Sequence, residues 1–425
     1  MPHVAPLPVY TKESFTIVSD SFANGTLIDM RTFVPKILDQ SYIGSCVGNA
    51  VAADLNFLSY RTHDATQWSA LGIYQDSLIF ENRVGQEGLN PYDAYQVLKT
   101  QGIGREVDWP YDPLKIAQTP PQIYRDHAQT ISGAHEITLD PDNFLTGAYA
   151  VRAALAEGRP VLVSFTAREW IRNMGHTLAT QQVELAQTNG FDQTIIGGHE
   201  VLIVGYDPKI NGGSFIFQNS WGTTWGDHGY GEMGVTWIQD WTTAVVIDGF
   251  AGKDYTYTPN KIFAAELYVA EMGRAADFGG LNYWAAQIAA TSLNAVSQIV
   301  YNMGVSTAGT DNNTQAITHF YQNVLGRAPD TPGLDYWNAK LVAGETRGAL
   351  IVELMAAVMG YVGIDIDALH SQALFKDKVA VSAYNAVMLE NNDIASSMHA
   401  LLNVTYDPQS VEIAKIGIHH DLGFA

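Results

Sequence analysis

The stretch GHEVLIVGYDPKINGGSFIFQNSWGTTWGDHGY, residues 198–230, holds two short apolar strands and two side chains able to interact. His199 follows two glycines and begins the first strand, and Asn219 ends the second strand, 20 residues further on. Both segments are rich in β-branched or aromatic residues and are bounded by Gly, Pro or Asn, as is typical of strands. A short hairpin return between them can place the Asn219 amide against the His199 imidazole.

A cysteine lies upstream of this pair, at the start of a predicted helix. Residues 45–61 carry apolar side chains at helical spacing, with Ser45 as a candidate N-cap: Val47, Val51, Leu55 and Leu58. Cys46, the single cysteine of the chain, falls in the first turn, where free N–H groups and the helix dipole favour a thiolate. Gln40, six residues earlier, can supply a side-chain donor beside the Cys46 N–H.

These four residues supply what catalysis by a thiol requires: a nucleophile, a base, a group that orients the base, and donors for an oxyanion. Each alone is a weak signal. A lone cysteine is more often a small buried hydrophobe, and one histidine among 12 is more often structural. Their combination in this order predicts nucleophilic catalysis.

Three segments of the chain resemble papain-like cysteine peptidases. Residues 40–46, QSYIGSC, resemble the Gln-to-Cys segment of that family, and residues 198–206 resemble its histidine strand. Residues 219–230 match the family's Asn-Ser-Trp-Gly block over almost their whole length. Residues 102–103 and 107–111 are similar to bacterial and viral branches that lack disulfides. The resemblance implies an α+β fold with two lobes, one helical and one β-barrel-like.

The resemblance also implies a role for each matching residue. Cys46 is the expected nucleophile, and His199 the general base and then acid. Asn219 is expected to orient His199, and Gln40 with the Cys46 N–H to form the oxyanion hole. The implied reaction is endopeptidase hydrolysis of a polypeptide substrate through a thioester acyl-enzyme. It needs no metal and no organic cofactor.

Three further residues are expected to support the site. Trp221 is expected to shield the His–Asn hydrogen bond from water, Gly198 to allow close approach, and Gly88, within residues 85–90, to contact the substrate backbone. Ile43 and Val47 stand where better-known relatives have Cys and Trp, which implies a lost disulfide half and a reshaped cleft wall.

Two segments outside these motifs are expected to control access to the site. Residues 167–198 are mostly polar and lack the apolar pattern of a buried segment, which predicts a long loop. Residues 1–28 contain three prolines among the first eight and predict an extended arm. We expect one of these segments, the loop more than the arm, to cover the cleft in the resting protein.

The C-terminal part of the chain contains an internal correspondence of 53 residues. Residues 267–284, LYVAEMGRAADFGGLNYW, align with residues 320–337, FYQNVLGRAPDTPGLDYW, with these identities: Tyr268/Tyr321, Gly273/Gly326, Arg274/Arg327, Asp277/Asp330, Gly280/Gly333, Leu281/Leu334 and Trp284/Trp337. A period of this length with few β-branched runs predicts helical hairpins. In each copy the Arg and Asp are expected to pair, the Asp also serving as an N-cap, while the Tyr and Trp are expected to be buried.

Residues 260–418 resemble a bacterial domain of unknown function that recurs in exported, surface-layer and toxin-like proteins. We therefore expect four parts: an arm at 1–28, a papain-like domain at 29–250, a linker at 251–261, and an all-α domain at 262–425 with two 53-residue-period repeats. The last is expected to target or bind a surface-layer, matrix or virion partner. The favoured location is extracellular or at the cell surface without an N-terminal signal, with a virion or the cytoplasm as alternatives.

Composition limits the other partners. The chain of 425 residues has 23 Lys and Arg against 44 Asp and Glu, a net charge of −21 whose field repels nucleic acid and anionic membranes. A hydrophobic content of 47% with 16% charged residues excludes disorder as the main state. No apolar run approaches the roughly 18 residues that a membrane span requires.

Two other functions stay open. The chain could be a structural surface or virion protein that uses the papain-like domain as a scaffold, although the complete set of Cys46, His199 and Asn219 argues against this. It could also be a transglutaminase-like acyl transferase, although Asn rather than Asp at 219, followed by Ser-Trp-Gly, disfavours that activity.

Overall fold

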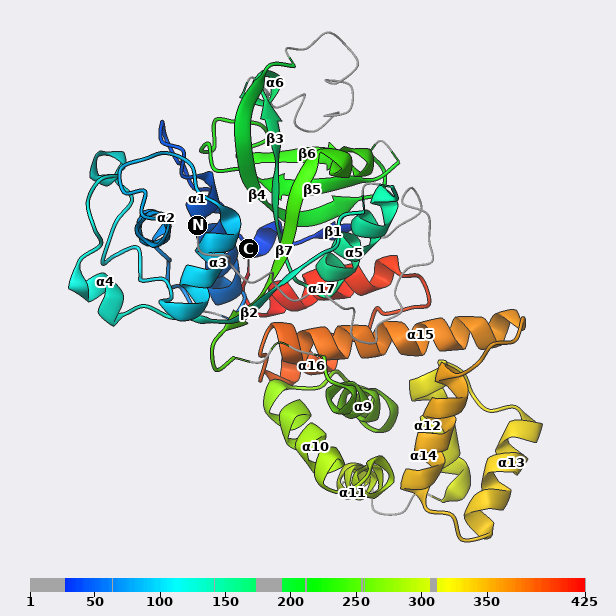
Figure 1. Ribbon diagram of the computed structural model, residues 1–425. Coiled ribbons are helices and arrows are strands. Elements are labelled where there is room, and N and C mark those ends of the chain that lie inside the picture. Colours follow the sequence, from blue (N-terminus) through cyan, green and yellow to red (C-terminus); the bar gives the residue numbers. More distant parts are fainter. Residues whose placement is uncertain are drawn as a thin grey trace. The chain divides into compact units, whose positions relative to one another are not determined.

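The computed structural model describes residues 27–62, 64–140, 142–172, 193–210, 212–253, 255, 257–305 and 312–424. The chain divides into two compact units, Met1–Tyr255 and Thr256–Ala425 (Figure 1). Most of the predicted arm, residues 1–26, and the middle of the predicted loop, residues 173–192, lie outside the described residues. The expected covering of the cleft by these segments stays a prediction.

The first unit begins with a group of helices. These are α1 (Cys46–Tyr60), α2 (Ala70–Phe80), α3 (Pro91–Thr100), α4 (Gln122–Asp126) and α5 (Phe144–Ala156), with 3-10 turns at Arg31–Phe33 and Pro113–Lys115. Every residue of α1 from Val47 to Ser59 is buried. Gly48 allows α2 to pack closely on α1, because a Cβ there would lie 2.6 Å from the Ala70 carbonyl oxygen. The helix predicted at 45–61 is thus the central helix of this group.

An antiparallel sheet forms the second part of this unit. Its strands are β1 (Ile28–Asp29), β2 (Ile131–Glu136), β3 (Val161–Arg168), β4 (Ile195–Asp207), β5 (Ser214–Gln218), β6 (Tyr230–Gly234) and β7 (Trp241–Phe250). They follow the order β2-β7-β3-β4-β5-β6, with β1 paired to β4, and a 3-10 turn at Val235–Asp240 precedes β7. The α+β architecture with a helical part and a strand part is confirmed, and Figure 1 shows the two parts side by side.

The ends of the predicted loop at 167–198 are not loop. Strand β3 continues to Arg168, helix α6 (Glu169–Arg172) follows, and β4 already begins at Ile195. Trp170 is buried against Trp237, with ring centroids 5.6 Å apart, and belongs to the core. The prediction was wrong there because one apolar pair among polar neighbours gives no periodic signal. Ile28 likewise belongs to the sheet and not to the arm, since it pairs with Tyr206.

The second unit is helical, and the described residues of this unit contain no strand. It comprises α9 (Pro259–Leu267), the π-helix η5 (Tyr268–Met272), α10 (Phe278–Ala290), α11 (Leu293–Val305), α12 (Asn313–Leu325), α13 (Thr331–Val342), α14 (Arg347–Met359), α15 (Ile366–Ala383), the π-helix η6 (Tyr384–Met388), α16 (Ile394–His399) and α17 (Gln409–Asp421). The expected all-α class of this unit is confirmed. Its exact limits at 262–425, like the linker at 251–261, stay predictions.

The two copies of the 53-residue correspondence share their turn. Gly273 and Gly326 end a helical segment in the left-handed region, with φ of 65° and 70°. The next helix is capped in one copy by Asp277, which accepts from the Gly280 N–H at 2.8 Å. In the other copy Asp330 accepts from the Gly333 N–H at 2.7 Å. The four aromatic residues expected to be buried are buried: Tyr268, Trp284, Tyr321 and Trp337.

Only one of the two expected ion pairs forms. Arg274 contacts Asp277 at 3.2 Å, and both side chains are largely shielded from solvent. Arg327 instead lies over the Tyr321 ring, 5.8 Å from its centroid, and makes no ion pair with Asp330. Arg327 and Asp330 are both exposed, so water competes with the ion pair. The prediction for the second copy was therefore wrong.

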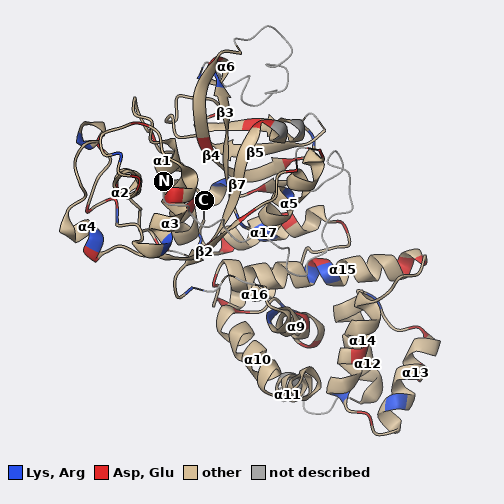
Figure 2. Ribbon diagram, viewed as in Figure 1, with Lys and Arg blue, Asp and Glu red and all other residues tan. Residues whose placement is uncertain are grey.

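Basic side chains are sparse in the structure, as the excess of acidic over basic residues in the sequence leads us to expect. In Figure 2 the segments coloured for Lys and Arg are few and lie apart, on α4, α13 and α15 among others. No helix among the described residues is long and apolar enough to cross a membrane.

A buried glutamate gives the second unit a testable pH dependence. The Glu271 carboxyl lies 2.5 Å from Ser297 Oγ, which is itself 2.9 Å from the Gly348 carbonyl oxygen. A hydroxyl has one proton, so both contacts are satisfied when Glu271 is protonated and Ser297 donates to Gly348. Burial raises the pKa of Glu271 to about 8, from 4.5. The folded protein therefore holds a proton there that the unfolded chain releases.

Stability should accordingly fall as pH rises from about 4.5 to about 8, because the folded state binds more protons over that range. Glu271→Gln keeps a neutral donor next to Ser297 and should remove this part of the loss. Urea unfolding of the full chain, followed by circular dichroism at three pH values, measures it. Equal pH dependence of the midpoint in the variant and the wild type would show that Glu271 is ionised in the folded protein.

Candidate active site

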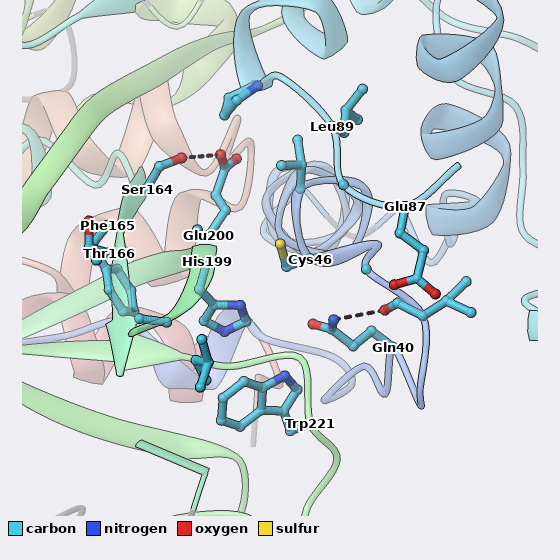
Figure 3. Close-up of a pocket in the computed structure, with 18 of the residues that line it drawn as sticks. Gln40, Cys46, Glu87, Leu89, Ser164, Phe165, Thr166, His199, Glu200 and Trp221 are labelled. Carbon is cyan, nitrogen blue, oxygen red and sulfur yellow. Dashed lines mark hydrogen bonds between the residues drawn. The ribbon is translucent and has the colours of Figure 1, made fainter. Parts of the chain in front are cut away.

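A cavity of about 1310 Å³ lies between the helical part and the sheet of the first unit. Its walls include six of the seven predicted site residues: Gln40, Cys46, Gly88, Gly198, His199 and Trp221. The seventh, Asn219, is buried behind His199. Figure 3 shows the His199 ring between Cys46 and Trp221, with Gln40 on the far side of Cys46. The structure thus brings together residues from positions as far apart in the chain as 40 and 221.

Cys46 is the first residue of α1, and the segment before it is held by hydrogen bonds. The Gln40 N–H donates to the Ser220 carbonyl oxygen at 2.8 Å, which ties this segment to the end of β5. Tyr111 Oη donates to the Gln40 carbonyl oxygen at 2.8 Å and lies 2.6 Å from Ser45 Oγ. Ser45 is the N-cap by position, but its side chain does not cap the helix. It bonds to Tyr111 instead.

The imidazole of His199 is fixed from three sides. Its Nε2 lies 2.8 Å from Asn219 Oδ1, and the same oxygen accepts the Ser220 N–H at 2.8 Å. This second bond identifies the amide atom as oxygen, so Nε2 carries the proton and Nδ1 can accept one. The Trp221 ring lies 4.7 Å from the imidazole, and the Phe165 ring meets it edge-on at 5.7 Å. The hairpin return predicted from the spacing does place the amide against the ring.

Burial sets the protonation of the two reactive groups. It raises the pKa of the Cys46 thiol to about 11, although the Glu200, Val47 and Cys46 N–H groups act to lower it. Burial also lowers the pKa of His199 to about 4, against the hydrogen bond to Asn219. The expectation that the helix start favours a thiolate is therefore outweighed. Each charge alone is unfavourable, and the two groups are best described as one coupled pair.

The Gln40 side chain is held on both sides of its amide. Its Nε2 donates to the Ile43 carbonyl oxygen at 3.0 Å, and its Oε1 accepts from Ser220 Oγ at 2.7 Å. The amide has a second N–H that these two bonds do not use.

Glycines shape two edges of the cavity. Gly88 has a φ of +76°, a conformation that favours glycine, and a Cβ added there would meet nothing within 4 Å. A Cβ on Gly198 would likewise meet nothing within 4 Å. Both positions leave open space beside backbone that lines the cavity. Val47, expected in the cleft wall, lines the cavity, and so does Ile43.

Glu200, the residue after His199, also lines the cavity and was not among the predicted site residues. Its carboxylate accepts from Ser164 Oγ at 2.6 Å and from Tyr95 Oη at 3.1 Å, and the side chain is 1% exposed. Burial raises the pKa of Glu200 to about 7. A signal was present in the sequence, because Glu200 is a charged residue inside the apolar strand that the histidine begins. Among the described residues, no group of three His, Cys, Asp or Glu side chains could hold a metal ion.

Comparison with known proteins identifies the class of this site. The family model of the papain family of cysteine proteases matches residues 25–240, about half of the chain, and the protein belongs to this family. A second model, described as a domain of unknown function (DUF4214), matches residues 305–358.

Individual relatives are similar over 50 to 59% of the chain. A peptidase C1-like protein of Acanthamoeba polyphaga mimivirus is 29% identical over 225 residues, covering 50% of this chain and 70% of the relative. The viral cathepsin of Spodoptera litura multicapsid nucleopolyhedrovirus is 25% identical, covering 51% and 59%. Xylellain, a cysteine protease from Xylella fastidiosa, has a solved structure that is 28% identical, with a TM-score of 0.45, and covers 59% of this chain and 94% of its own.

Proposed function

We propose that the first unit is a cysteine endopeptidase in which Cys46 is the nucleophile and His199 the proton acceptor. The observation that carries this proposal is the 2.8 Å bond between His199 Nε2 and Asn219 Oδ1. It leaves Nδ1 able to take a proton, on a ring that lines the same cavity as Cys46. Family membership supports the same reaction class.

The reaction follows from these groups. His199 Nδ1 takes the thiol proton as the Cys46 sulfur bonds to the substrate carbonyl carbon, and the carbonyl oxygen becomes an oxyanion. The Cys46 N–H and the unused N–H of the Gln40 amide are the donors for this oxyanion. His199 then gives the proton to the leaving nitrogen as the C–N bond breaks, which yields a thioester and a free amine.

Water completes the cycle. His199 takes a proton from a water molecule as that water attacks the thioester, and the proton returns to sulfur as the acid product leaves. Trp221, packed on the imidazole, keeps water away from the His199–Asn219 bond, so the ring keeps its orientation through both steps.

Labelling of the thiol tests the proposal. The chain has one cysteine, so covalent incorporation of an epoxysuccinyl inhibitor reports Cys46 directly. We expect one adduct per chain on the peptide that contains Cys46, and loss of peptide hydrolysis in proportion to labelling. Complete labelling of Cys46 with peptide hydrolysis intact would show that Cys46 is not the nucleophile.

Asn219→Ala and Gln40→Ala should each lower kcat/KM by about 10- to 1,000-fold, as expected for an orienting residue and one oxyanion donor. A short fluorogenic peptide measures the loss. Asn143→Ala is a matched control, because Asn143 is exposed and its side chain caps nothing. A silent Asn219→Ala together with an essential Asp would favour the transglutaminase-like reaction.

We further propose that the helical unit targets or binds a surface-layer, matrix or virion partner and takes no part in catalysis. Its support is the match to a domain distinct from the peptidase family. A chain ending at Tyr255 should hydrolyse short peptides as fast as the full chain. A loss of that activity in a truncated chain with native circular dichroism would contradict the separation.

A further inference from the structure

The sheet presents a row of polar side chains to the cavity beside Cys46. Ser164 on β3 lies directly opposite Glu200 on β4 and opposite Thr243 on β7. Residues directly opposite in neighbouring strands project from the same face of a sheet. All three line the cavity, and all three are less than one-tenth exposed. We call these three residues the polar row.

Two observations indicate that the polar row faces a ligand. Thr243 Oγ1 is buried and has no hydrogen-bond partner, although burying an unpaired hydroxyl is unfavourable. The Glu200 carboxylate has one donor on each oxygen, Tyr95 Oη on Oε1 and Ser164 Oγ on Oε2. Each oxygen can accept a second bond. The row therefore offers acceptors, and one of them has no partner in the protein.

The row lies on one side of the reactive thiol. Figure 3 shows Glu200 and Ser164 on the side of Cys46 opposite Gln40, with Leu89 across the cavity. Glu200 lines the same cavity as Cys46, and its backbone N–H acts to lower the pKa of the thiol. A substrate bound for attack by Cys46 would therefore place a neighbouring side chain against the polar row.

We propose that the polar row selects a basic side chain, lysine or arginine, next to the peptide bond that Cys46 attacks. The inference rests on the proposed function and adds its substrate class. An ammonium or guanidinium group donates to Glu200 and to Thr243 Oγ1 together, and the pairing offsets the cost of the buried carboxylate. An apolar side chain would leave Thr243 unpaired and Glu200 without a counter-charge.

The preference should depend on pH. Burial raises the pKa of Glu200 to about 7, while Ser164 and Tyr95 act to lower it. The titratable groups around it are Cys46 from α1, Tyr95 from α3 and His199 in β4, and β3 and β7 contribute the uncharged Ser164 and Thr243. The carboxylate is charged above pH 7 and neutral below it. Selection for a basic side chain should therefore strengthen as pH rises from about 6 to about 8.

Matched peptides test the inference on the full chain. At each position near the scissile bond, lysine is compared with norleucine, which has nearly the same shape and no charge. At one position we expect kcat/KM to favour lysine by about tenfold or more at pH 8, and less at pH 6. Glu200→Gln should bring that ratio close to one, and Thr243→Val should lower it. Equal rates for the two peptides at every position would overturn the inference.

Glu232→Gln is the matched control. Glu232 lies on β6, and burial raises the pKa of its carboxyl to about 7 as well, but it does not line the cavity. Its replacement should leave the lysine-to-norleucine ratio unchanged. A drop equal to that of Glu200→Gln would show a general effect of charge and would contradict a specific contact.

Binding separates this inference from the proposed function. Calorimetry with the Cys46→Ala variant compares the same lysine and norleucine peptides and needs no hydrolysis. Tighter binding of the lysine peptide, by about tenfold, would support the polar row even if Cys46 proved not to be the nucleophile. Equal binding would refute the polar row even if the wild-type chain is an active peptidase.

Discussion

Cys46→Ala should abolish hydrolysis of unfolded protein substrates and leave the fold intact. The variant lacks the sulfur that forms the thioester, so less than about a hundredth of wild-type turnover should remain. Cys46 is half-buried, and loss of one sulfur atom at the start of α1 removes little packing. The segment in front of it keeps its hydrogen bonds, such as that from Tyr111 to Gln40.

The assay pairs turnover of a denatured protein with the thermal midpoint and circular dichroism of the same variant. A native spectrum with lost turnover identifies a chemical role. Turnover above about a hundredth of the wild-type value would reject Cys46 as the nucleophile. A wild-type chain without hydrolytic activity would favour the scaffold hypothesis instead.

His199→Ala should be nearly as severe as Cys46→Ala. Burial raises the pKa of the Cys46 thiol to about 11, so at pH 7 about one thiol in 10,000 is ionised without help from a base. The imidazole removes this limit because it takes the proton during attack. Without it, only the rare thiolate can react.

The remaining activity of His199→Ala should therefore rise about tenfold for each pH unit between about pH 7 and 9, as hydroxide replaces the base. The rate of alkylation of the single thiol should rise in parallel. His420→Ala, an exposed histidine of α17, is the control and should behave as the wild type. A residual rate that does not change with pH would show that His199 is not the proton acceptor.

The local part of this site could be predicted from the sequence. Helix α1, strands β4 and β5, and the pairing of His199 with Asn219 all depend on short-range patterns and on a return of 20 residues. In motifs of this kind the local sequence determines the geometry, because the turn and the strand register fix which side chains contact each other. The residues that supply the polar atoms of the site could therefore be predicted from the sequence.

The environment of the site could not be predicted in the same way. The shifts in the pKa values of Cys46 and His199 arise from burial between two parts of the unit, which is a tertiary property. The position of β7 beside β3 joins residues about 80 apart in the chain and creates the neighbours of Ser164, including Thr243. No local pattern near Glu200 indicates that Thr243 would share its face of the sheet.

Mass spectrometry of the acyl-enzyme tests whether Cys46 is the residue that the substrate acylates. A peptide ester is mixed with the full chain, the reaction is quenched in acid during turnover, and the intact mass is measured before peptide mapping. We expect one acyl group per chain, on the peptide that contains Cys46, and no such adduct in the Cys46→Ala variant. Turnover of the ester by the wild type with no adduct, or with the adduct on another residue, would contradict it.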